Sequence, residues 1–433
     1  MRGFSSTFAA ALAASAFALL APSAGAQPAA GAAAAGPDLP FSSRPSLARE
    51  ASARPISAGK LERKLSKLAR RAPGASGYYV KDLDAGAKAV LFDADEGKRR
   101  KLASNEKLFT TSTALSVLGA EGRIETTVKA EGTVTDAGRL RGDIYLIGGG
   151  DPSFGPAGVG DLATDVKRAG IKRIGGKVVA DPSVFDNRPG VPDSNYGISE
   201  YIAPLRGLVY GGSTYDGDPA LQAGQAFKEG LRDAGIKVGG KVKVDELPGK
   251  LKGSPEIGVY ESETIASLAA ATNKPSNNFY AEMLLKRLAA TPKRQGTTRR
   301  GTKIVERFAH RLGSDVDAKD GSGLTNSNKS SPRDIVALLD AVRDERGIGN
   351  AFVDSLAVAG KEGTLDDRMG GTVAAGRCRG KTGTIDGVSN LSGYCRSGKH
   401  MVAFSLLMNG VGDYEGARAI QDKMVVEIAR YRP

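Results

Sequence analysis

The sequence has no tryptophan, two cysteines and two histidines among its 433 residues, and aromatic residues make up only 6% of it. The core must therefore be built mainly from alanine, leucine and valine. The two histidines, His310 and His400, stand alone, which argues against a Ser-His-Asp triad and against a histidine-rich zinc site. We therefore expect no metal or other cofactor, and we expect each histidine to be structural or exposed.

Long apolar segments are also rare, and the one near the N-terminus is short. Arg2 precedes an apolar run from Phe8 to Leu20, and Ala24-Gly25-Ala26 is typical of a signal cleavage site. This pattern predicts a signal peptide over residues 1–26 rather than an uncleaved anchor, because the run is too short for a comfortable membrane span. No later segment is long and apolar enough to span a bilayer. We expect an exported protein of the periplasm, the extracellular space or the cell wall.

The net charge of +13 indicates either a polyanionic environment, such as a cell wall, or a solvated basic surface without a specific partner. Nucleic acid is another common partner of basic proteins. Export and the lack of a recognised nucleic-acid-binding motif argue against it.

The rest of the chain divides by composition and pattern. Residues 27–50 are rich in Ala, Gly and Pro, which predicts a flexible tether. Residues 51–121 combine a helix, a strand pair and a second helix that begins at Ser104. Strands dominate residues 122–254, and helices return in residues 255–433 before a strand-rich end. We predict an α/β fold in which a sheet flanked by helices is interrupted by a mostly β inserted domain.

A weak repeat lies in the inserted part. Ala169-Gly170-Ile171-Lys172 and Ala234-Gly235-Ile236-Lys237 each follow a helical stretch and each precede the residues Gly-Gly-Lys-Val. The repeat predicts two helix–turn–strand units of one small domain; the alternative is coincidental reuse of a common turn.

Three short motifs occur in a fixed order. They are Ser104-Asn105-Glu106-Lys107, Ser276-Asn277-Asn278 and Lys381-Thr382-Gly383-Thr384. Each is weak alone, but together they supply a nucleophile, groups that move its proton and a cationic strand edge for an anionic acyl substrate. The ordered set S-x-x-K, S-x-N and K-T-G is known from penicillin-binding proteins and class A β-lactamases.

The first two motifs suit nucleophilic catalysis. Ser104 and Lys107 lie three residues apart on one helix face, and Lys107 can take the hydroxyl proton if burial or nearby cations lower its pKa. Ser276 is suited to relay a proton to the leaving amine, or to cap the following helix. The Asn278 amide is expected to bond a substrate amide and the lysine. Ser57-Ala58-Gly59-Lys60 also matches S-x-x-K, but we interpret this match as chance.

The third motif is interpreted as a strand edge. Lys381 supplies positive potential, Thr382 and Thr384 supply hydroxyls for a carboxylate, and Gly383 lets the backbone approach the ligand closely. The backbone N–H groups of Thr384 and Ser104 are expected to form an oxyanion hole.

A hairpin signal, Asp386-Gly387, follows the third motif. A turn centred between these two residues places Cys378 directly opposite Cys395, in a close pair without backbone hydrogen bonds. Because exported proteins form disulfides, we predict that a Cys378–Cys395 bond staples this hairpin.

At this point the chain resembles the class C low-molecular-mass penicillin-binding proteins, the D-alanyl-D-alanine carboxypeptidase/endopeptidase family. The similarity covers most of the chain from about residue 60. Beyond the three motifs, it is carried by residues 273–284 around the second motif and by residues 148–152, 320–324, 356–360 and 363–365.

The resemblance implies a serine DD-peptidase with a β-lactamase/transpeptidase-like fold. Ser104 is then the acylated serine, Lys107 its base, and the third motif the site of the terminal carboxylate. The implied substrates are the D-Ala-D-Ala ends of peptidoglycan stem peptides and D-Ala–meso-diaminopimelate cross-links, and β-lactams acylate the same serine. Ser104 and Ser276 lie closer in sequence than this family suggests, which predicts a nested third domain reduced to a loop around Tyr210 to Asp218.

Two alternatives remain. A serine β-lactamase of class A uses an E-x-x-L-N loop between the second and third motifs, but no glutamate there has asparagine four positions later. Slow deacylation is therefore expected. A non-catalytic cell-wall-binding scaffold with a relic site is disfavoured by the complete set of catalytic side chains.

Overall fold

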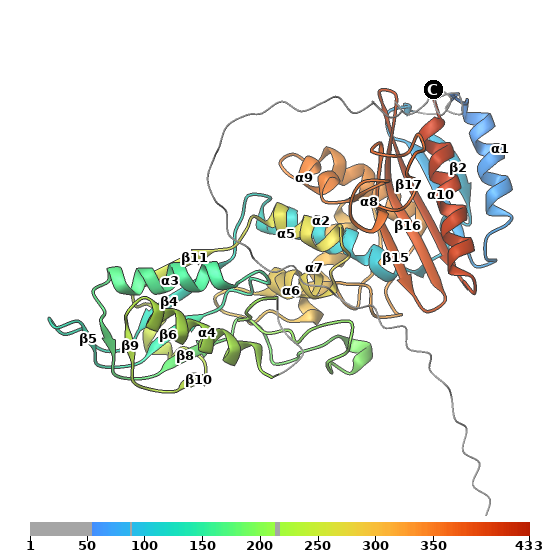
Figure 1. Ribbon diagram of the computed structural model, residues 1–433. Coiled ribbons are helices and arrows are strands. Elements are labelled where there is room, and N and C mark those ends of the chain that lie inside the picture. The colour runs from blue at the N-terminus through green and yellow to red at the C-terminus, as the bar shows by residue number, and fades with distance from the viewer. Residues whose placement is uncertain (1–53, 87–88, 213–216) are drawn as a thin grey trace, which may run out of the picture. The chain divides into compact units, whose positions relative to one another are not determined.

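The structure, a computed structural model, describes residues 54–86, 89–212 and 217–433 (Figure 1). The predicted signal peptide and tether lie outside these residues. Lys88, in the strand pair predicted within residues 51–121, and part of the predicted loop around Tyr210 to Asp218 lie outside them too. No helix in the described ranges is long and apolar enough to cross a membrane.

A six-stranded sheet forms the frame on which the three motifs meet. Its strands follow the order β14-β15-β16-β17-β1-β2, and every neighbouring pair is antiparallel. Strands from the two ends of the chain therefore share one sheet. The bounds are β1 Gly77–Asp82, β2 Val90–Ala94, β14 Ala357–Val358, β15 Cys378–Ile385, β16 Val388–Ser397 and β17 His400–Asn409.

Helices cover both faces of this sheet (Figure 1). One face, with Val80 and Leu391, packs against the first and last helices, α1 and α10. The other face, with Tyr394 and Leu407, packs against a cluster of helices from the middle of the chain. The bounds are α1 Ala58–Ala69, α2 Glu106–Leu118, α5 Ile265–Asn273, α6 Asn278–Ala289, α7 Thr298–Arg311, α8 Pro332–Asp344, α9 Gly349–Asp354 and α10 Tyr414–Arg430. The predicted α/β class is confirmed.

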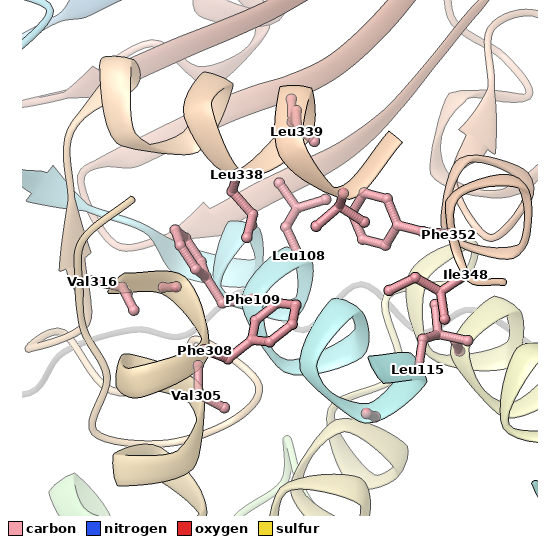
Figure 2. Close-up of a cluster of buried hydrophobic side chains, with 14 of the residues drawn as sticks. Leu108, Phe109, Leu115, Val305, Phe308, Val316, Leu338, Leu339, Ile348 and Phe352 are labelled. Carbon is pink, nitrogen blue, oxygen red and sulfur yellow. The ribbon is translucent and has the colours of Figure 1, made fainter. Parts of the chain in front are cut away.

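Helix α2 is enclosed by this helical layer. Leu108, Phe109 and Leu115 are fully buried, and side chains from α7, α8 and α9 surround them (Figure 2). Such burial fixes the position of the residues that begin the helix. The sequence predicted a helix beginning at Ser104, but α2 begins at Glu106, and Ser104 lies in the preceding 3-10 turn, Ala103–Asn105.

The predicted inserted part contains two further sheets. A five-stranded sheet has the order β10-β8-β6-β4-β11, and a three-stranded sheet has the order β5-β7-β9. Their bounds are β4 Glu125–Ala130, β5 Arg139–Leu140, β6 Ile144–Ile147, β7 Arg173–Ile174, β8 Val178–Asp181, β9 Lys237–Val238, β10 Val242–Val244 and β11 Gly258–Glu261. Strand β11 belongs to this sheet although it follows residue 254. The division into domains at residues 122 and 254 stays a prediction.

The two copies of the predicted repeat lie side by side. Helix α3 (Pro156–Arg168) leads into β7 and β8, and helix α4 (Pro219–Asp233) leads into β9 and β10. β7 pairs with β9 in parallel, and β8 pairs with β10 in parallel. The repeat as two helix–turn–strand units is therefore confirmed. A small sheet of β3 (Arg100–Lys101), β12 (Val316–Asp317) and β13 (Lys329–Ser330) completes the fold.

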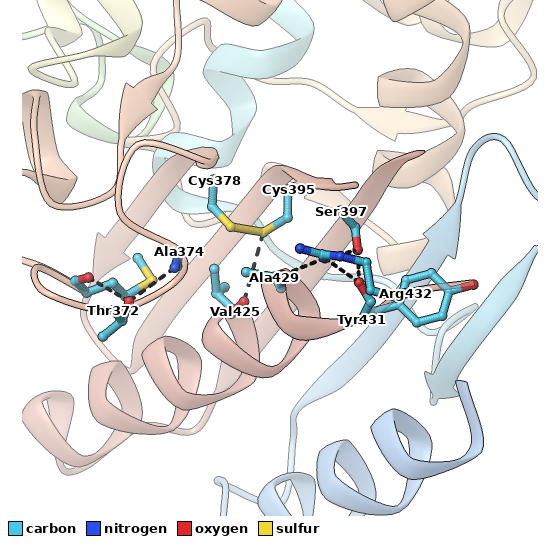
Figure 3. Close-up of a disulfide and its surroundings, with 10 residues drawn as sticks. Thr372, Ala374, Cys378, Cys395, Ser397, Val425, Ala429, Tyr431 and Arg432 are labelled. Atoms are coloured by element: carbon cyan, nitrogen blue, oxygen red, sulfur yellow. Dashed lines mark hydrogen bonds between the residues drawn. A yellow bond between two sulfur atoms is a disulfide. The ribbon is translucent and has the colours of Figure 1, made fainter. Parts of the chain in front are cut away.

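The hairpin of β15 and β16 is closed by a disulfide. Ile385 pairs with Val388 next to the turn, and Cys378 pairs with Cys395 at the far end. The two cysteines are buried and bonded, and their Cα atoms lie 4.1 Å apart (Figure 3). This short separation is typical of the close, non-hydrogen-bonded pair of an antiparallel ladder. Both the predicted register and the predicted bond are confirmed.

Candidate active site

Ser104 is held at a strained turn that opens into a cavity. The preceding residue, Ala103, has a left-handed backbone with φ of 46°, a conformation uncommon for residues other than glycine. Gly323 packs directly against this turn, because a Cβ there would lie only 1.8 Å from the Ala103 carbonyl oxygen. The cavity has a volume of about 650 Å³ and is lined by Ser104, Ser276 and both threonines of the third motif.

Lys107 is fully buried beside this serine and has three hydrogen-bond partners. Its Nζ lies 2.9 Å from Ser104 Oγ, 2.7 Å from Asn278 Oδ1 and 2.7 Å from the carbonyl oxygen of Ser322. Burial lowers the pKa of Lys107 to about 7, although the nearby carboxyl groups of Asp320 and Glu282 act in the opposite direction.

The three partners fit an ammonium group with three donors, and they also fit a neutral amine. A neutral lysine has two N–H groups and one lone pair. The oxygens of Asn278 and Ser322 can only accept, so they take the two N–H groups and leave the lone pair for the hydroxyl proton of Ser104. The full burial of Lys107 meets the condition set in the sequence analysis, and its role as the base of Ser104 stays a prediction.

The second motif lies at the start of α6. Asn277, rather than Ser276, caps this helix, and its side-chain oxygen accepts a hydrogen bond from the Tyr280 N–H. Ser276 has a left-handed backbone with φ of 63° and lines the cavity beside Ser104. The Asn278 oxygen binds Lys107 as expected, whereas its amide nitrogen donates to the Tyr201 carbonyl at 3.0 Å.

The third motif forms part of β15. Lys381 is fully buried and its Nζ donates to the Thr382 carbonyl oxygen at 2.9 Å. Burial, reinforced by the charge of Lys107, holds the pKa of Lys381 well below its usual range. The Thr382 hydroxyl lies 2.9 Å from the Thr364 hydroxyl, and Thr384 is exposed at the cavity.

Position 383 requires glycine for a structural reason that the sequence did not suggest. A Cβ at this position would lie 2.8 Å from the Leu102 carbonyl oxygen and 2.9 Å from the Asn105 amide nitrogen. That nitrogen also donates to the Lys381 carbonyl oxygen at 3.1 Å. Glycine therefore lets β15 pack directly against the turn that carries Ser104. The predicted role of Gly383 toward a ligand stays a prediction.

Two supporting segments had no assigned role at the sequence level. The turn of residues 320–324 supplies the Ser322 carbonyl that binds Lys107, and Glu282 of α6 holds this turn by accepting from the N–H groups of Gly321 and Ser322, both at 2.8 Å. Burial raises the pKa of Glu282 to about 8. The likeness of these segments to the family was the only signal, and it named no function for them.

The second S-x-x-K match and the two histidines are separate from this site. Ser57 and Lys60 are both exposed at the start of α1. His400 lies 2.8 Å from the buried carboxylate of Asp82, and His310 is exposed beside Asp315. These positions confirm the structural or surface roles predicted for the histidines.

Comparison with known proteins gives consistent relatives. A D-alanyl-D-alanine carboxypeptidase of Actinomadura sp. (strain R39) is 28% identical to this chain. The matched region covers 82% of this chain and 81% of that protein. The D-alanyl-D-alanine carboxypeptidase DacB of Haemophilus influenzae is 24% identical, over 81% of this chain and 89% of that protein. Among solved structures, penicillin binding protein 4 (dacB) from Haemophilus influenzae has a TM-score of 0.70 at 21% identity, covering 83% of this chain and 97% of its own.

The family model described as D-Ala-D-Ala carboxypeptidase 3 (S13) matches residues 59–215 and 210–431, which is most of the chain. The chain therefore belongs to the D-Ala-D-Ala carboxypeptidase 3 (S13) family, which confirms the predicted family, its β-lactamase/transpeptidase-like fold and its serine DD-peptidase activity.

Proposed function

We propose that Ser104 is the nucleophile of this serine DD-peptidase and that Lys107 is its general base. The observation that carries the proposal is the buried Lys107 amine, which has two fixed acceptors and the Ser104 hydroxyl around it and a pKa of about 7. A base with a pKa near the working pH is partly present in its neutral form and still binds a proton strongly enough to take it from the serine.

Acylation follows from this arrangement. Ser104 Oγ attacks the carbonyl carbon of the penultimate D-Ala, and its proton passes to Lys107 Nζ as the new C–O bond forms. The N–H groups of Ser104 and Thr384 stabilise the oxyanion. The C–N bond then breaks, and the leaving amine takes a proton from Lys107 through the Ser276 hydroxyl. Water hydrolyses the acyl-enzyme and restores Ser104.

Substrate binding places a negative charge beside the third motif. The hydroxyls of Thr382 and Thr384 bind the terminal carboxylate, and this negative charge favours the protonated form of the buried Lys381. The charges of Lys107 and Lys381 disfavour each other, so the two amines are not expected to be protonated together in the absence of substrate.

The substrates we propose are peptidoglycan stem peptides that end in D-Ala-D-Ala, reached after export through the signal at residues 1–26. β-Lactams act as covalent inhibitors at Ser104. Cleavage of D-Ala–meso-diaminopimelate cross-links is a second activity, since the cavity extends from Ser104 to Arg418 of α10 and offers room for a leaving group larger than D-Ala.

Release of D-Ala from a synthetic acyl-D-Ala-D-Ala peptide tests the proposal. Ser104→Ala should abolish release, because the nucleophile is removed. Ser57→Ala is a matched control in the second S-x-x-K sequence and should keep the wild-type rate. Release by the Ser104→Ala variant, or loss of release in the Ser57→Ala variant, would refute the assignment. A cross-linked muropeptide dimer measures the second activity.

A further inference from the structure

Four arginines line a second cavity, at the end of the β15–β16 hairpin that carries the disulfide. The cavity has a volume of about 530 Å³, and its lining includes Arg343 of α8, Arg377, Arg379, Arg396 and Asp354. We call it the arginine cavity. Lys361 adds positive charge next to the cavity. Its Nζ lies 2.8 Å from the position that a Cβ of the lining residue Gly376 would take.

The register of the hairpin gathers these arginines. Cys378 and Cys395 are paired and point toward α10, where Cys395 contacts Val425. Because side chains alternate along a strand, Arg377, Arg379 and Arg396 point to the opposite face of the sheet. Arg396 also donates its backbone N–H to the Arg377 carbonyl oxygen, so these two arginines lie across from each other.

The charges in this cavity are only partly balanced. Arg379 pairs with Asp354 at 3.1 Å, and Arg343 pairs with Asp84 and Asp344. Within residues 54–86, 89–212 and 217–433, no acidic group lies at ion-pair distance from Arg377 or Arg396. Like charges directly opposite on antiparallel strands are destabilising. The side chains of Arg377 and Arg396 are both exposed, so solvent screens most of this repulsion, and an anion in the cavity would offset what remains.

We propose that the arginine cavity is a second binding site, which takes carboxylate groups of the peptidoglycan polymer while Ser104 acts on another stem. Guanidinium groups bind carboxylates through paired hydrogen bonds. A concave site admits single oxyanion groups, which a flat membrane surface does not present as well. The choice of polymer rests on the proposed function.

The position of the cavity supports two contacts on one polymer. Arg377 and Lys381 are four residues apart, which is about 13 Å along an extended strand. β14 pairs with Arg379 and Gly380 between these residues, and the cavity at Ser104 is lined from the α10 side of the sheet, so one polymer must pass around this edge to reach both sites. A long polymer with repeated carboxylates can do so, and the second contact then raises the local concentration of stems near Ser104. The arginine cavity should matter for the polymer and not for a short synthetic peptide.

Cosedimentation with purified peptidoglycan, stripped of other polymers, tests this proposal. All proteins carry Ser104→Ala, so that the polymer stays intact and the measurement does not depend on catalysis. Adding Arg377→Gln and Arg396→Gln should weaken binding by about tenfold. The matched control, Arg168→Gln with Arg232→Gln on α3 and α4, removes the same charge from positions that are also exposed but lie outside the cavity, and should change binding less than twofold. Equal loss in both pairs would overturn the proposal.

Three further readouts separate this site from other roles. Carbodiimide amidation neutralises the carboxylates of the polymer. After it, the proteins with and without the two arginine substitutions should bind the polymer equally, and a difference in binding that persists contradicts carboxylate binding. If the Arg377→Gln, Arg396→Gln variant still binds the polymer but no longer binds phosphatidylglycerol vesicles, the cavity is a membrane site and the proposal is wrong. With Ser104 intact, the Arg377→Gln, Arg396→Gln protein should turn over a synthetic peptide at the wild-type rate.

Thermal stability without polymer should change in the opposite direction to polymer binding when the two arginines are replaced. Removal of the repulsion should raise the melting temperature of the double variant by about one degree at low salt. A fall would indicate that the arginines support the fold, and would overturn the proposal. Failure of penicillin to acylate Ser104 would instead refute the proposed catalytic function and leave the binding result interpretable.

Discussion

Nζ of Lys107 lies 2.7 Å from Oδ1 of Asn278, although the two residues are 171 positions apart in the sequence. The carboxamide is neutral, so it accepts a hydrogen bond from the amine in either protonation state. It orients Lys107 toward Ser104 without adding the negative charge that would favour the ammonium form. This contact explains why the second motif needs an amide at this position rather than a carboxylate.

The pH dependence of acylation tests this contact. Acylation of the wild-type protein should rise with pH through a midpoint near 7, because Lys107 acts in its neutral form. Asn278→Asp places a carboxylate beside the amine and should raise that midpoint by roughly 1 to 3 pH units. The measurement is the second-order rate constant for a chromogenic β-lactam between pH 5 and 10. An unchanged midpoint in the variant would mean that the titration of Lys107 does not cause the rise of the acylation rate with pH.

Stability at different pH values tests the buried carboxyl of Glu282. Its pKa is raised from 4.5 to about 8, mainly by burial. Between these values the folded protein holds a proton that the unfolded chain has lost, so this group lowers stability as pH rises through that window. Relative to Glu282→Gln, the wild-type free energy of unfolding should fall by up to a few kcal/mol between pH 5 and 8. Urea unfolding at each pH measures the difference, and parallel curves would contradict the raised pKa.

Gly383→Ala tests the close packing of β15 against the turn that carries Ser104. A Cβ would meet the Leu102 carbonyl oxygen at 2.8 Å, so either the strand or the turn must move. Acylation by penicillin should fall by roughly 5- to 150-fold if the overpacking cost of about 1–3 kcal/mol falls on the acylation step. Gly370→Ala is the matched control, because a Cβ there meets nothing within 4 Å. Equal acylation rates for the two variants would show that the contact does not position Ser104.

The disulfide should stabilise the strand that carries the third motif. Replacement of both Cys378 and Cys395 by alanine removes a link that closes a loop of sequence separation 17, which typically costs about 3 kcal/mol. Chemical unfolding under non-reducing conditions measures this loss. Because the two cysteines are bonded to each other and buried, the wild-type protein should show no free thiol even after unfolding without a reductant. Reactive thiols in the unfolded, non-reduced protein would contradict the bond.

Much of this site follows from local sequence rules. The S-x-x-K spacing placed Ser104 and Lys107 together, and the Asp386-Gly387 turn fixed the register that joins Cys378 to Cys395. Both depend on periodicity within one element or one hairpin, which sequence spacing determines directly. The repeat of the inserted part was visible for the same reason.

Other features depend on contacts between distant segments. The carbonyl of Ser322 reaches Lys107 from a turn more than two hundred residues away, and Glu282 holds that turn through backbone N–H groups. A backbone acceptor carries no side-chain signature, so no pattern in the sequence assigns it a role. The left-handed backbone of Ala103 is likewise imposed by its surroundings, since alanine has no preference for that conformation.

The central claim is that Ser104 forms the acyl-enzyme, and peptide mapping by mass spectrometry after incubation with penicillin tests it most directly. The account predicts a lasting adduct on the peptide that contains Ser104, present in the Ser57→Ala control and absent in Ser104→Ala. Slow deacylation keeps this adduct long enough to be mapped. Intact drug with no adduct would favour a non-catalytic scaffold, and hydrolysed drug with no adduct would make the protein a β-lactamase; an adduct on any other residue would contradict the assignment of the nucleophile.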